Sequence, residues 1–355
     1  MSDARIPGLL VSVLLAGNAM ATTYCVNNGT ELRSALITAA SNGATDEIRV
    51  AIGLYEVNSG DTAFSYSTNE DFGLAIIGGY NATCTSINSI ASLTVLDGED
   101  QRQVLSLKGS SSSSGSIAVY NLLIRYGYTD EQGAGLSMGG PTGFSGSTSV
   151  TNVIFLENTS TTAIGGLAII NPLGRITVLG SLFIANACAF DYCAFDMISN
   201  AVATAIYPTP VMFGNNTVVD NFCISGAPAS CDVSGGRFYG DANTAFFNNA
   251  FAYNEDSDLR VQGPNVNLDH NNVLLVVGTP ASETGNVAFT NPLFAGPGNY
   301  RLRSDSPLRN IGTIGPYPFY TVDLDGRTRI YGPNVDIGAF ENNVAIFGHG
   351  FETPF

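Results

Sequence analysis

The stretch Asn215-Asn-Thr-Val-Val-Asp-Asn221 decides the fold, because its pattern returns along the chain at an almost constant interval. Asn248-Asn-Ala-Phe-Ala-Tyr-Asn254 repeats it: Asn or Gly stands at the first and seventh positions, with a short, mostly apolar stretch between them. The copies begin at Asn121, Asn152, Gly180, Asn215 and Asn248, and Asn271-Asn-Val-Leu-Leu-Val-Val277 is a degenerate sixth copy. Their first residues lie 31, 28, 35, 33 and 23 positions apart. Such a period is typical of a solenoid.

Short strands separated by turn residues surround these copies. Ile48–Ile52 and Leu74–Ile77 are mostly apolar, and Gly78-Gly79 follows the second of them. Gly135-Leu136 and Gly166-Leu167 each begin 14 residues after the first Asn of their copy (121 to 135, 152 to 166). This constant register predicts stacked coils of short parallel strands, which is a β-helix, and counts against a β-sandwich with frequent turns.

Asparagine suits the corners of such coils for two reasons. Its backbone tolerates left-handed geometry, and its side-chain amide can form a hydrogen bond with the amide in the next coil. The repeated Asn residues therefore predict ladders of hydrogen bonds along the stack.

The segment Thr30–Ala40 is the best candidate for a helix. Thr30 can cap it, Glu31 suits its positive N-terminal end, and the apolar residues fall on one face: Leu32, Ala35, Leu36 and Ala39. A lone amphipathic helix before a run of strands is expected to cover the apolar end of the first coil.

The composition narrows the classes of partner. The chain has 355 residues, of which 12% are charged, and 14 basic residues stand against 30 acidic ones for a net charge of −16. Binding to a nucleic-acid backbone depends on clustered Lys and Arg, so this class is excluded, and an anionic membrane surface is disfavoured for the same reason. A polyuronate would also be repelled.

The N-terminus has the features of a secretory signal peptide. Arg5 precedes the apolar run Leu9–Leu15, and Ala19-Met-Ala21 supplies a small-residue cleavage site. That run is too short to span a bilayer, and no later segment is long and apolar enough, so no transmembrane span is expected. The sequence leaves the oligomeric state open.

Six cysteines follow the predicted cleavage site, and an even number in an exported chain implies disulfides. Six cysteines allow 15 connectivities. Sequence proximity suggests Cys188–Cys193 and Cys223–Cys231, which leaves Cys25–Cys84. A zinc site is the alternative, but no pair has Cys-x-x-Cys spacing and the chain has only two histidines.

The candidate catalytic residues are Asp256, Asp258 and Arg260. In β-helix polysaccharide lyases, carboxylates hold Ca²⁺ against a uronate and an Arg or Lys acts as the base. Spacing by two on a strand places Asp256, Asp258 and Arg260 on one face, where the two acids can share a cation. A solvated acidic loop is the competing interpretation. No cofactor or metal is expected otherwise.

Two acid pairs are alternatives for a glycoside hydrolase, which needs two carboxyl groups about 5–10 Å apart. They are Asp130 with Glu131, and Asp220 with Glu157 on a neighbouring coil. Asp323-Leu-Asp325-Gly326 begins like a calcium loop but lacks the Glu that such a loop has at its twelfth position, so pairing with Arg327 or Arg329 is expected instead.

The chain after about Thr290 changes character and is expected to form a cap at the end of the stack. The run Asn291-Pro-Leu-Phe294, Asp323-Leu-Asp-Gly-Arg327 and Asp336-Ile-Gly-Ala-Phe-Glu341 resembles the end of bacterial right-handed parallel β-helix proteins of the choice-of-anchor Q type. Gly78-Gly-Tyr-Asn-Ala-Thr-Cys84 is similar to their N-terminal part. These proteins are related in shape to pectate lyases and polymorphic outer-membrane proteins.

This resemblance implies an all-β, single-stranded right-handed parallel β-helix with an N-terminal capping helix and a C-terminal cap, and a secreted or cell-surface location. It implies no reaction. The expected organisation is a signal peptide (1–21), the β-helix with its N-terminal cap (22–315), a closing motif (316–341) and a tail (342–355). Within the tail, Ile346–Glu352 resembles a sorting or attachment signal of exported Gram-negative proteins.

The leading functional hypothesis is a non-catalytic β-helix that presents a long surface for adhesion or for binding polysaccharide or cell-surface glycans. Stacked Tyr and Phe would supply any sugar-binding platform, because the chain has no Trp. The alternative is a polysaccharide lyase or glycoside hydrolase that acts in a groove along the β-helix.

Overall fold

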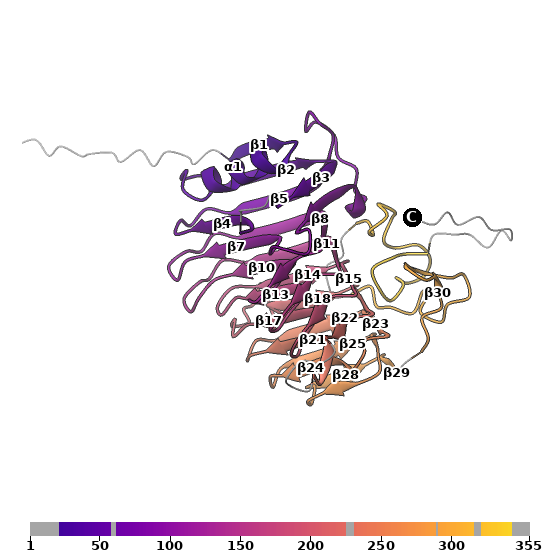
Figure 1. Ribbon diagram of the computed structural model, residues 1–355. Helices are drawn as coiled ribbons and strands as arrows, with labels where there is room; N and C mark the ends of the chain where they lie inside the picture. The colour runs from indigo at the N-terminus through magenta and orange to yellow at the C-terminus, as the bar shows by residue number, and fades with distance from the viewer. Residues whose placement is uncertain (1–20, 58–61, 225–230, 289, 316–320, 343–355) are drawn as a thin grey trace, which may run out of the picture.

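The computed structural model describes residues 21–57, 62–224, 231–288, 290–315 and 321–342. All of the predicted signal peptide except Ala21, and all of the predicted tail except Asn342, lie outside these residues. Figure 1 shows the strands stacked as successive coils, from α1 (Gly29–Ala39) at one end to β28 (Ser282–Thr284) and β29 (Val287–Ala288) at the other.

Within the described residues, the coils build three parallel sheets. The largest sheet covers two faces, because β8 (Ile117–Arg125) and β11 (Thr148–Leu156) continue around the corner between them. The other strands of its first face are β1 (Thr22–Val26), β2 (Asp46–Ala51), β5 (Leu74–Tyr80), β14 (Ile176–Leu179), β18 (Val211–Gly214), β22 (Thr244–Phe247), β25 (Val266–Asp269) and β28. The other strands of its second face are β3 (Gly53–Glu56), β6 (Thr94–Asp97), β15 (Leu182–Ile184), β19 (Thr217–Val219), β23 (Ala250–Ala252), β26 (Asn272–Val273) and β29.

Two further parallel sheets belong to the coils, and the shorter one has strands from four of them. The longer one contains β4 (Phe64–Thr68), β7 (Leu105–Gly109), β10 (Leu136–Gly139), β13 (Leu167–Ile170), β17 (Phe195–Ile198), β21 (Val233–Tyr239), β24 (Ser257–Gln262) and β27 (Val276–Val277). The shorter one contains β9 (Tyr128–Thr129), β12 (Thr159–Ser160), β16 (Ala187–Cys188) and β20 (Phe222–Cys223). The predicted fold, a right-handed parallel β-helix, is confirmed.

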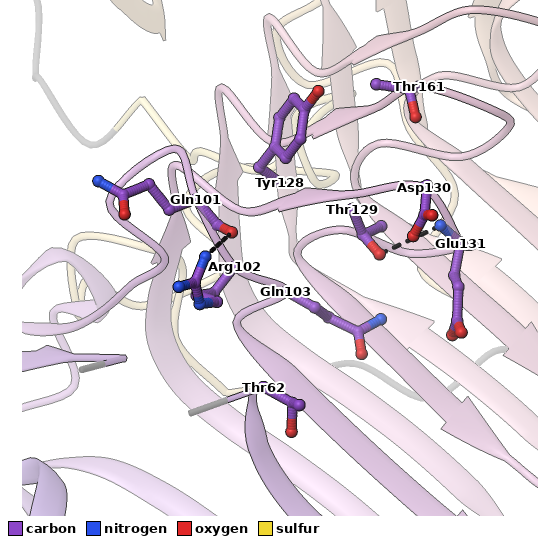
Figure 2. A pocket seen from close by; sticks show the side chains of 9 residues that line it. All are labelled: Thr62, Gln101, Arg102, Gln103, Tyr128, Thr129, Asp130, Glu131 and Thr161. Atoms are coloured by element: carbon purple, nitrogen blue, oxygen red, sulfur yellow. Dashed lines mark hydrogen bonds between the residues drawn. The ribbon is translucent and has the colours of Figure 1, made fainter. Parts of the chain in front are cut away.

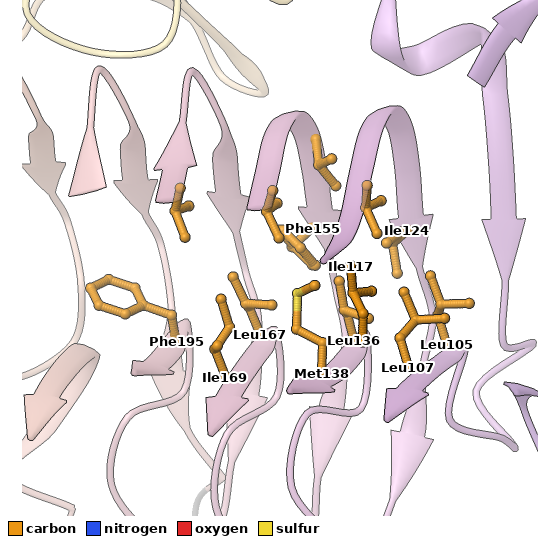
Figure 3. Packing of buried hydrophobic residues seen from close by; sticks show 14 of the residues in the cluster. Leu105, Leu107, Ile117, Ile124, Leu136, Met138, Phe155, Leu167, Ile169 and Phe195 are labelled. Atoms are coloured by element: carbon orange, nitrogen blue, oxygen red, sulfur yellow. The ribbon is translucent and has the colours of Figure 1, made fainter. Parts of the chain in front are cut away.

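The core is a column of apolar side chains that occupy equivalent positions in successive coils. Leu105, Leu136, Leu167 and Phe195 pair in register and point into the centre of the stack, as Figure 3 shows. Aromatic rings continue the column toward the last coils, where the ring centroids of Phe195 and Phe213 are 4.3 Å apart. Because each inward side chain packs on its copy above and below, the β-helix has one continuous core.

The repeated Asn residues form the corners that the sequence predicts. All first positions of the five copies have left-handed backbones, with φ between 54° and 58°. The seventh positions form a ladder: Nδ2 of Asn158 donates to Oδ1 of Asn186 (2.9 Å), Asn186 to Asn221 (3.0 Å) and Asn221 to Asn254 (2.9 Å). Each of these hydrogen bonds between side-chain amides thus connects one coil to the next.

The sixth copy is shifted by one residue from the predicted alignment. Ala250 pairs with Asn272, so Asn248 corresponds to His270 and not to Asn271. His270 has the left-handed backbone of a first position, with φ of 54°. Asn271 instead continues a second ladder, in which Asn249 donates to its Oδ1 at 2.8 Å.

The helix α1 covers the first coils as predicted, with Leu32, Ala35, Leu36 and Ala39 buried. Its N-cap differs from the prediction. Asn28, not Thr30, caps the helix: Oδ1 of Asn28 accepts from the backbone of Glu31 at 3.0 Å, and the Glu31 carboxylate accepts from Asn27 N and Asn28 Nδ2, both at 2.7 Å. This reciprocal capping arrangement starts the helix one residue earlier than Thr30.

The C-terminal segment, described for residues 290–315 and 321–342, lies along the side of the stack (Figure 1), whereas the sequence predicted a cap over its end. It contains the antiparallel strands β30 (Phe294–Gly296) and β31 (Asn299–Leu302). The reason is a strip of apolar side chains that point outward from the second face and pack against the segment: Leu123, Ile154, Leu182 and Val219. Leu324, Ala339 and Phe340 cover this strip, together with Ala91 of the short 3-10 helix η1 (Ala91–Leu93).

The closing motif forms a buried charged cluster within this segment. Arg329 is 2% exposed, and the charges of Asp323, Asp336 and Glu341 act on it. The acids mainly accept backbone N–H groups; Glu341, for example, accepts from Tyr331 (3.1 Å) and Asp336 (3.0 Å). Of the predicted pairs between an acid and an arginine, Asp325 and Arg327 are present as an ion pair, with Nη1 of Arg327 3.8 Å from Oδ2 of Asp325.

Three disulfides connect the pairs that proximity suggests: Cys25–Cys84, Cys188–Cys193 and Cys223–Cys231. The last two bridges lie together, since their four Sγ atoms are all within 4.8 Å of one another. They fasten the loops that follow β16 and β20 on neighbouring coils.

Candidate functional site

The structure separates Asp258 from the other two predicted catalytic residues, Asp256 and Arg260. Asp258 is 4% exposed, and its carboxylate accepts from Asn254 Nδ2 (3.0 Å), Leu274 N (2.9 Å) and Leu275 N (3.4 Å). Burial raises its pKa, and these hydrogen bonds oppose the rise. Asp258 therefore ends the first Asn ladder, which is a structural role.

Asp256 and Arg260 line a separate hollow of about 370 Å³. Asp256 is exposed and precedes β24, so it does not share the strand spacing expected with Asp258. Arg260 lies 3.7 Å from Asp191 and 3.5 Å from Asp232, and its guanidinium donates to the Tyr192 hydroxyl at 3.3 Å. A cation shared by Asp256 and Asp258, with Arg260 as base, stays a prediction, while these contacts favour ion pairing for Arg260.

A larger hollow of about 700 Å³ lies beside the shorter sheet, and we call it the lateral hollow (Figure 2). Its residues come from four separate stretches of the chain: Thr62, Gln101, Arg102, Gln103, Tyr128, Thr129, Asp130, Glu131 and Thr161. The Tyr128 ring is 41% exposed and stands among amide, hydroxyl and carboxylate groups.

Backbone pairing between coils holds these side chains in place. Tyr128 N donates to Arg102 O at 2.9 Å, and Thr161 N donates to Thr129 O at 2.9 Å. Gln103 Nε2 donates to the carbonyls of Gln132 (3.2 Å) and Gly133 (2.9 Å) on the next coil. The lateral hollow is therefore a rigid feature of the stack and offers both donors and acceptors around one aromatic ring.

The acids Asp130 and Glu131, one of the predicted hydrolase pairs, both line the lateral hollow. They are consecutive residues of the turn after β9, and their backbone carbonyls accept from the next coil: Thr162 Oγ1 donates to Asp130 O (3.0 Å) and Ser160 Oγ to Glu131 O (2.7 Å). The pair therefore contributes two carboxylates to the hollow from one tightly fixed turn.

Lys108, the single lysine of the chain, lies on β7 and is not among the residues that line this hollow. Its ammonium group donates to Ser137 Oγ on β10 at 2.6 Å. Burial lowers the pKa of Lys108 to about 8, and the charge of Glu131 opposes that shift. A substantial neutral fraction of this amine at slightly alkaline pH makes it a candidate general base.

No sequence motif marks the lateral hollow as a site. Thr62, Gln101, Tyr128 and Thr161 carry no motif, and only the register between coils brings them together. Lys108 had a detectable signal, since it is the only lysine and stands in an alternating strand pattern.

The described residues include two groups that could hold a metal ion, but both contain disulfide-bonded cysteines: the two adjacent bridges, and Cys223 with Glu255 and Asp256. Over the same part of the chain, the structure contains no helix with the length and apolarity needed to cross a bilayer.

No family model matches the chain, and no curated protein matches it. Among solved structures, it is similar to one described as the crystal structure of pectate lyase Pel9A, with 13% sequence identity over 91% of this chain and 96% of that chain. The TM-score is 0.40, so the likeness carries no argument about activity.

Proposed function

We propose that this protein is a secreted or cell-surface β-helix that binds polysaccharide chains without cleaving them, in the lateral hollow. The observation that carries the proposal is the exposed Tyr128 ring surrounded by polar side chains from several coils. An aromatic face supplies area for a sugar ring, and the nearby amides and carboxylates can form hydrogen bonds with its hydroxyls.

The charge of the protein favours neutral polysaccharides as ligands. The net charge is −16, and Asp130 and Glu131 outnumber Arg102 in the lateral hollow. An anionic polysaccharide would be repelled at low ionic strength. The disulfides support an oxidising compartment outside the cytosol.

Affinity electrophoresis and calorimetry with neutral and uronic polysaccharides test this proposal. We expect binding to neutral chains and a loss of about 2- to 10-fold in affinity for Tyr128→Ala, the usual contribution of one aromatic contact. Tyr239→Ala is the matched control, because Tyr239 is 50% exposed but lies on β21, away from the hollow. Equal loss in both variants, or no binding to any polysaccharide, would refute the proposal.

A polysaccharide lyase is the second candidate, and Lys108 is the observation that favours it. A neutral amine can remove a proton from a bound sugar, and the charge of Glu131, which lines the hollow, acts on Lys108. The carboxylates of Asp130 and Glu131 are oxygen ligands suited to Ca²⁺. If Lys108 is the base, the rate should rise with pH through about 8, because deprotonation produces the active form.

The lyase candidate is tested by the absorbance of unsaturated products, with added Ca²⁺ or a chelator. Product formation that disappears in Lys108→Met would establish it. Unsaturated products at the same rate in that variant would exclude Lys108 as the base, and no product from the wild type would leave binding as the function.

A further inference from the structure

A second pocket lies between the stack and the hairpin of β30 and β31, and we call it the hairpin pocket. Its volume is about 380 Å³, and the residues that matter here are Asp220, Tyr253, Asn291, Phe294, Tyr300 and Arg303. This volume is within the range of ligand sites, roughly 300–1,000 Å³.

The fold explains why Asp220 and Tyr253 face this pocket. Both occupy the sixth position of the repeat, immediately before a ladder Asn, and both have left-handed backbones with φ of 56° and 57°. They are one coil apart, because Val219 pairs with Ala252. Their side chains therefore leave the same corner of the stack about 4.8 Å apart along its axis.

Three aromatic rings form the walls of the hairpin pocket. Phe294 stands edge-on to Tyr253, with centroids 6.2 Å apart, and edge-on to Tyr300, with centroids 5.4 Å apart. Tyr253 is 48% exposed, whereas Phe294 and Tyr300 pack against the outward apolar strip of the coils. The packing of the C-terminal segment thus holds a rigid aromatic surface beside the stack.

Two polar residues that line the hairpin pocket each have one side-chain atom without a hydrogen bond among the described residues. Tyr300 donates its hydroxyl hydrogen to Oδ2 of Asp220 at 2.6 Å, and within the described residues Oδ1 has no hydrogen-bond donor. Tyr253 donates to Oδ1 of Asn291 at 2.9 Å, and among those residues Nδ2 of Asn291 has no acceptor. One free acceptor and one free donor beside aromatic rings match the hydroxyl groups and apolar face of a sugar ring.

The hairpin pocket and the lateral hollow follow the same corner of the stack. Tyr128 stands in register with Phe222 three coils further on, and Asp220 precedes Phe222 by two residues. At about 4.8 Å per coil, Asp220 is about 14 Å and Tyr253 about 19 Å from Tyr128 along the axis. An extended chain lying along this corner would reach both sites.

We propose that the hairpin pocket is a second subsite for the same polysaccharide chain, which it holds three coils away from the lateral hollow. This inference rests on the proposed function. Two linked contacts on one ligand act at high effective concentration, so affinity should increase sharply once the ligand is long enough to reach both sites.

The test measures the affinity of a length series of neutral oligosaccharides for the whole protein. With the wild type, affinity should rise steeply at the length that spans about 14–19 Å. In Tyr253→Ala, that rise should be reduced by about 2- to 10-fold, whereas the affinity for short ligands is unchanged. Asp220→Asn should also weaken the binding of long ligands. This variant keeps an acceptor oxygen for Tyr300, so a folding defect is not expected.

Asp241→Asn is the control, because Asp241 is an exposed acid outside both sites. If Tyr253→Ala and Asp220→Asn bind long ligands as tightly as the wild type while Tyr128→Ala does not, the second subsite is refuted and the proposed function survives. If Tyr128→Ala also leaves every affinity unchanged, both ideas fail.

Discussion

At the scale of single residues, the buried Asn side chains do most to fix the spacing of the coils. Asn221 is fully buried, and its Oδ1 accepts two hydrogen bonds from Asn186, one from the backbone N and one from Nδ2, both at 3.0 Å. Its own Nδ2 donates to Asn254 and to Phe183 O. A residue with this many partners cannot be removed without leaving buried donors unpaired.

Asn221→Ala is therefore expected to lower the free energy of unfolding by about 2–4 kcal/mol, because two donors of Asn186 lose their acceptor. Denaturation by urea, followed by circular dichroism, measures the change. Asn243→Ala is the control, since Asn243 is exposed and makes one side-chain hydrogen bond, to Pro208 O at 3.2 Å. A loss no greater than that of the control would show that the ladder adds no stability.

Glu341 is the residue whose titration should be visible in the stability of the protein. Burial raises its pKa to about 7, with Asp336 adding to the rise and Arg329 opposing it. The pKa in the folded state is thus above the value of 4.5 for an ordinary Glu, so the folded state binds more protons between these values. The stability that protonated Glu341 contributes is fully present below about pH 4.5 and is lost as the pH rises through about 7.

We expect the thermal midpoint of the wild type to fall by several degrees between pH 5 and pH 8, and to fall less in Glu341→Gln. The variant keeps one of the two acceptor oxygens, so it should be less stable than the wild type at pH 5. Scanning calorimetry across this range gives both slopes. Parallel slopes would mean that Glu341 does not titrate in this range.

At the scale of elements, α1 shows how far the sequence predicts a boundary. The apolar face was predictable from spacing, because Leu32, Leu36 and Ala39 repeat with the helical period. The N-cap was not, because Asn28 and Thr30 are both good capping residues. The choice depends on Glu31, which reaches back to the backbone N–H of Asn27 and the side chain of Asn28.

Substituting each of the two candidate N-cap residues shows which of them caps the helix. Asn28→Ala should destabilise the protein by about 1 kcal/mol, the usual effect of losing an N-cap, and Thr30→Ala should have little effect because Thr30 is exposed within the first turn. Chemical denaturation of the two variants side by side gives the comparison. The reverse order would contradict the observed cap.

At the scale of the whole molecule, the C-terminal segment completes the protein by covering the apolar side of the stack. Phe340 is 4% exposed, packs in this interface and lies under the guanidinium of Arg301, 4.8 Å from the ring centroid. The outward apolar residues of the strands, such as Leu182 and Val219, would otherwise face water.

Phe340→Ala should remove about 3–5 kcal/mol from the stability of this interface, the usual cost of deleting a buried aromatic side chain. Limited proteolysis should then cut within residues 290–342 at a protease concentration that leaves the wild type intact. Phe222→Ala is the control, since Phe222 is 42% exposed. Equal resistance of all three proteins would show that the segment does not depend on this contact.

The sequence predicted the fold because the fold repeats: five copies with Asn or Gly at fixed positions report one local geometry five times. It did not predict the lateral hollow or the hairpin pocket, because each collects residues from several coils and carries no motif. The side position of the C-terminal segment was missed for a related reason. The outward apolar residues Leu123 and Ile154 look like ordinary strand residues until their direction is known.

The regular stacking has a consequence for how such a protein can change its size. Each ladder Asn is hydrogen-bonded to its equivalents in the neighbouring coils, so the height of the stack can change without breaking the ladder only by complete coils, whereas the loops within a coil vary in length. Duplicating one coil between the two proposed subsites would move them apart by one step of about 4.8 Å. The number of coils would then set the distance between the subsites, and the ligand length at which affinity rises would shift by that same step.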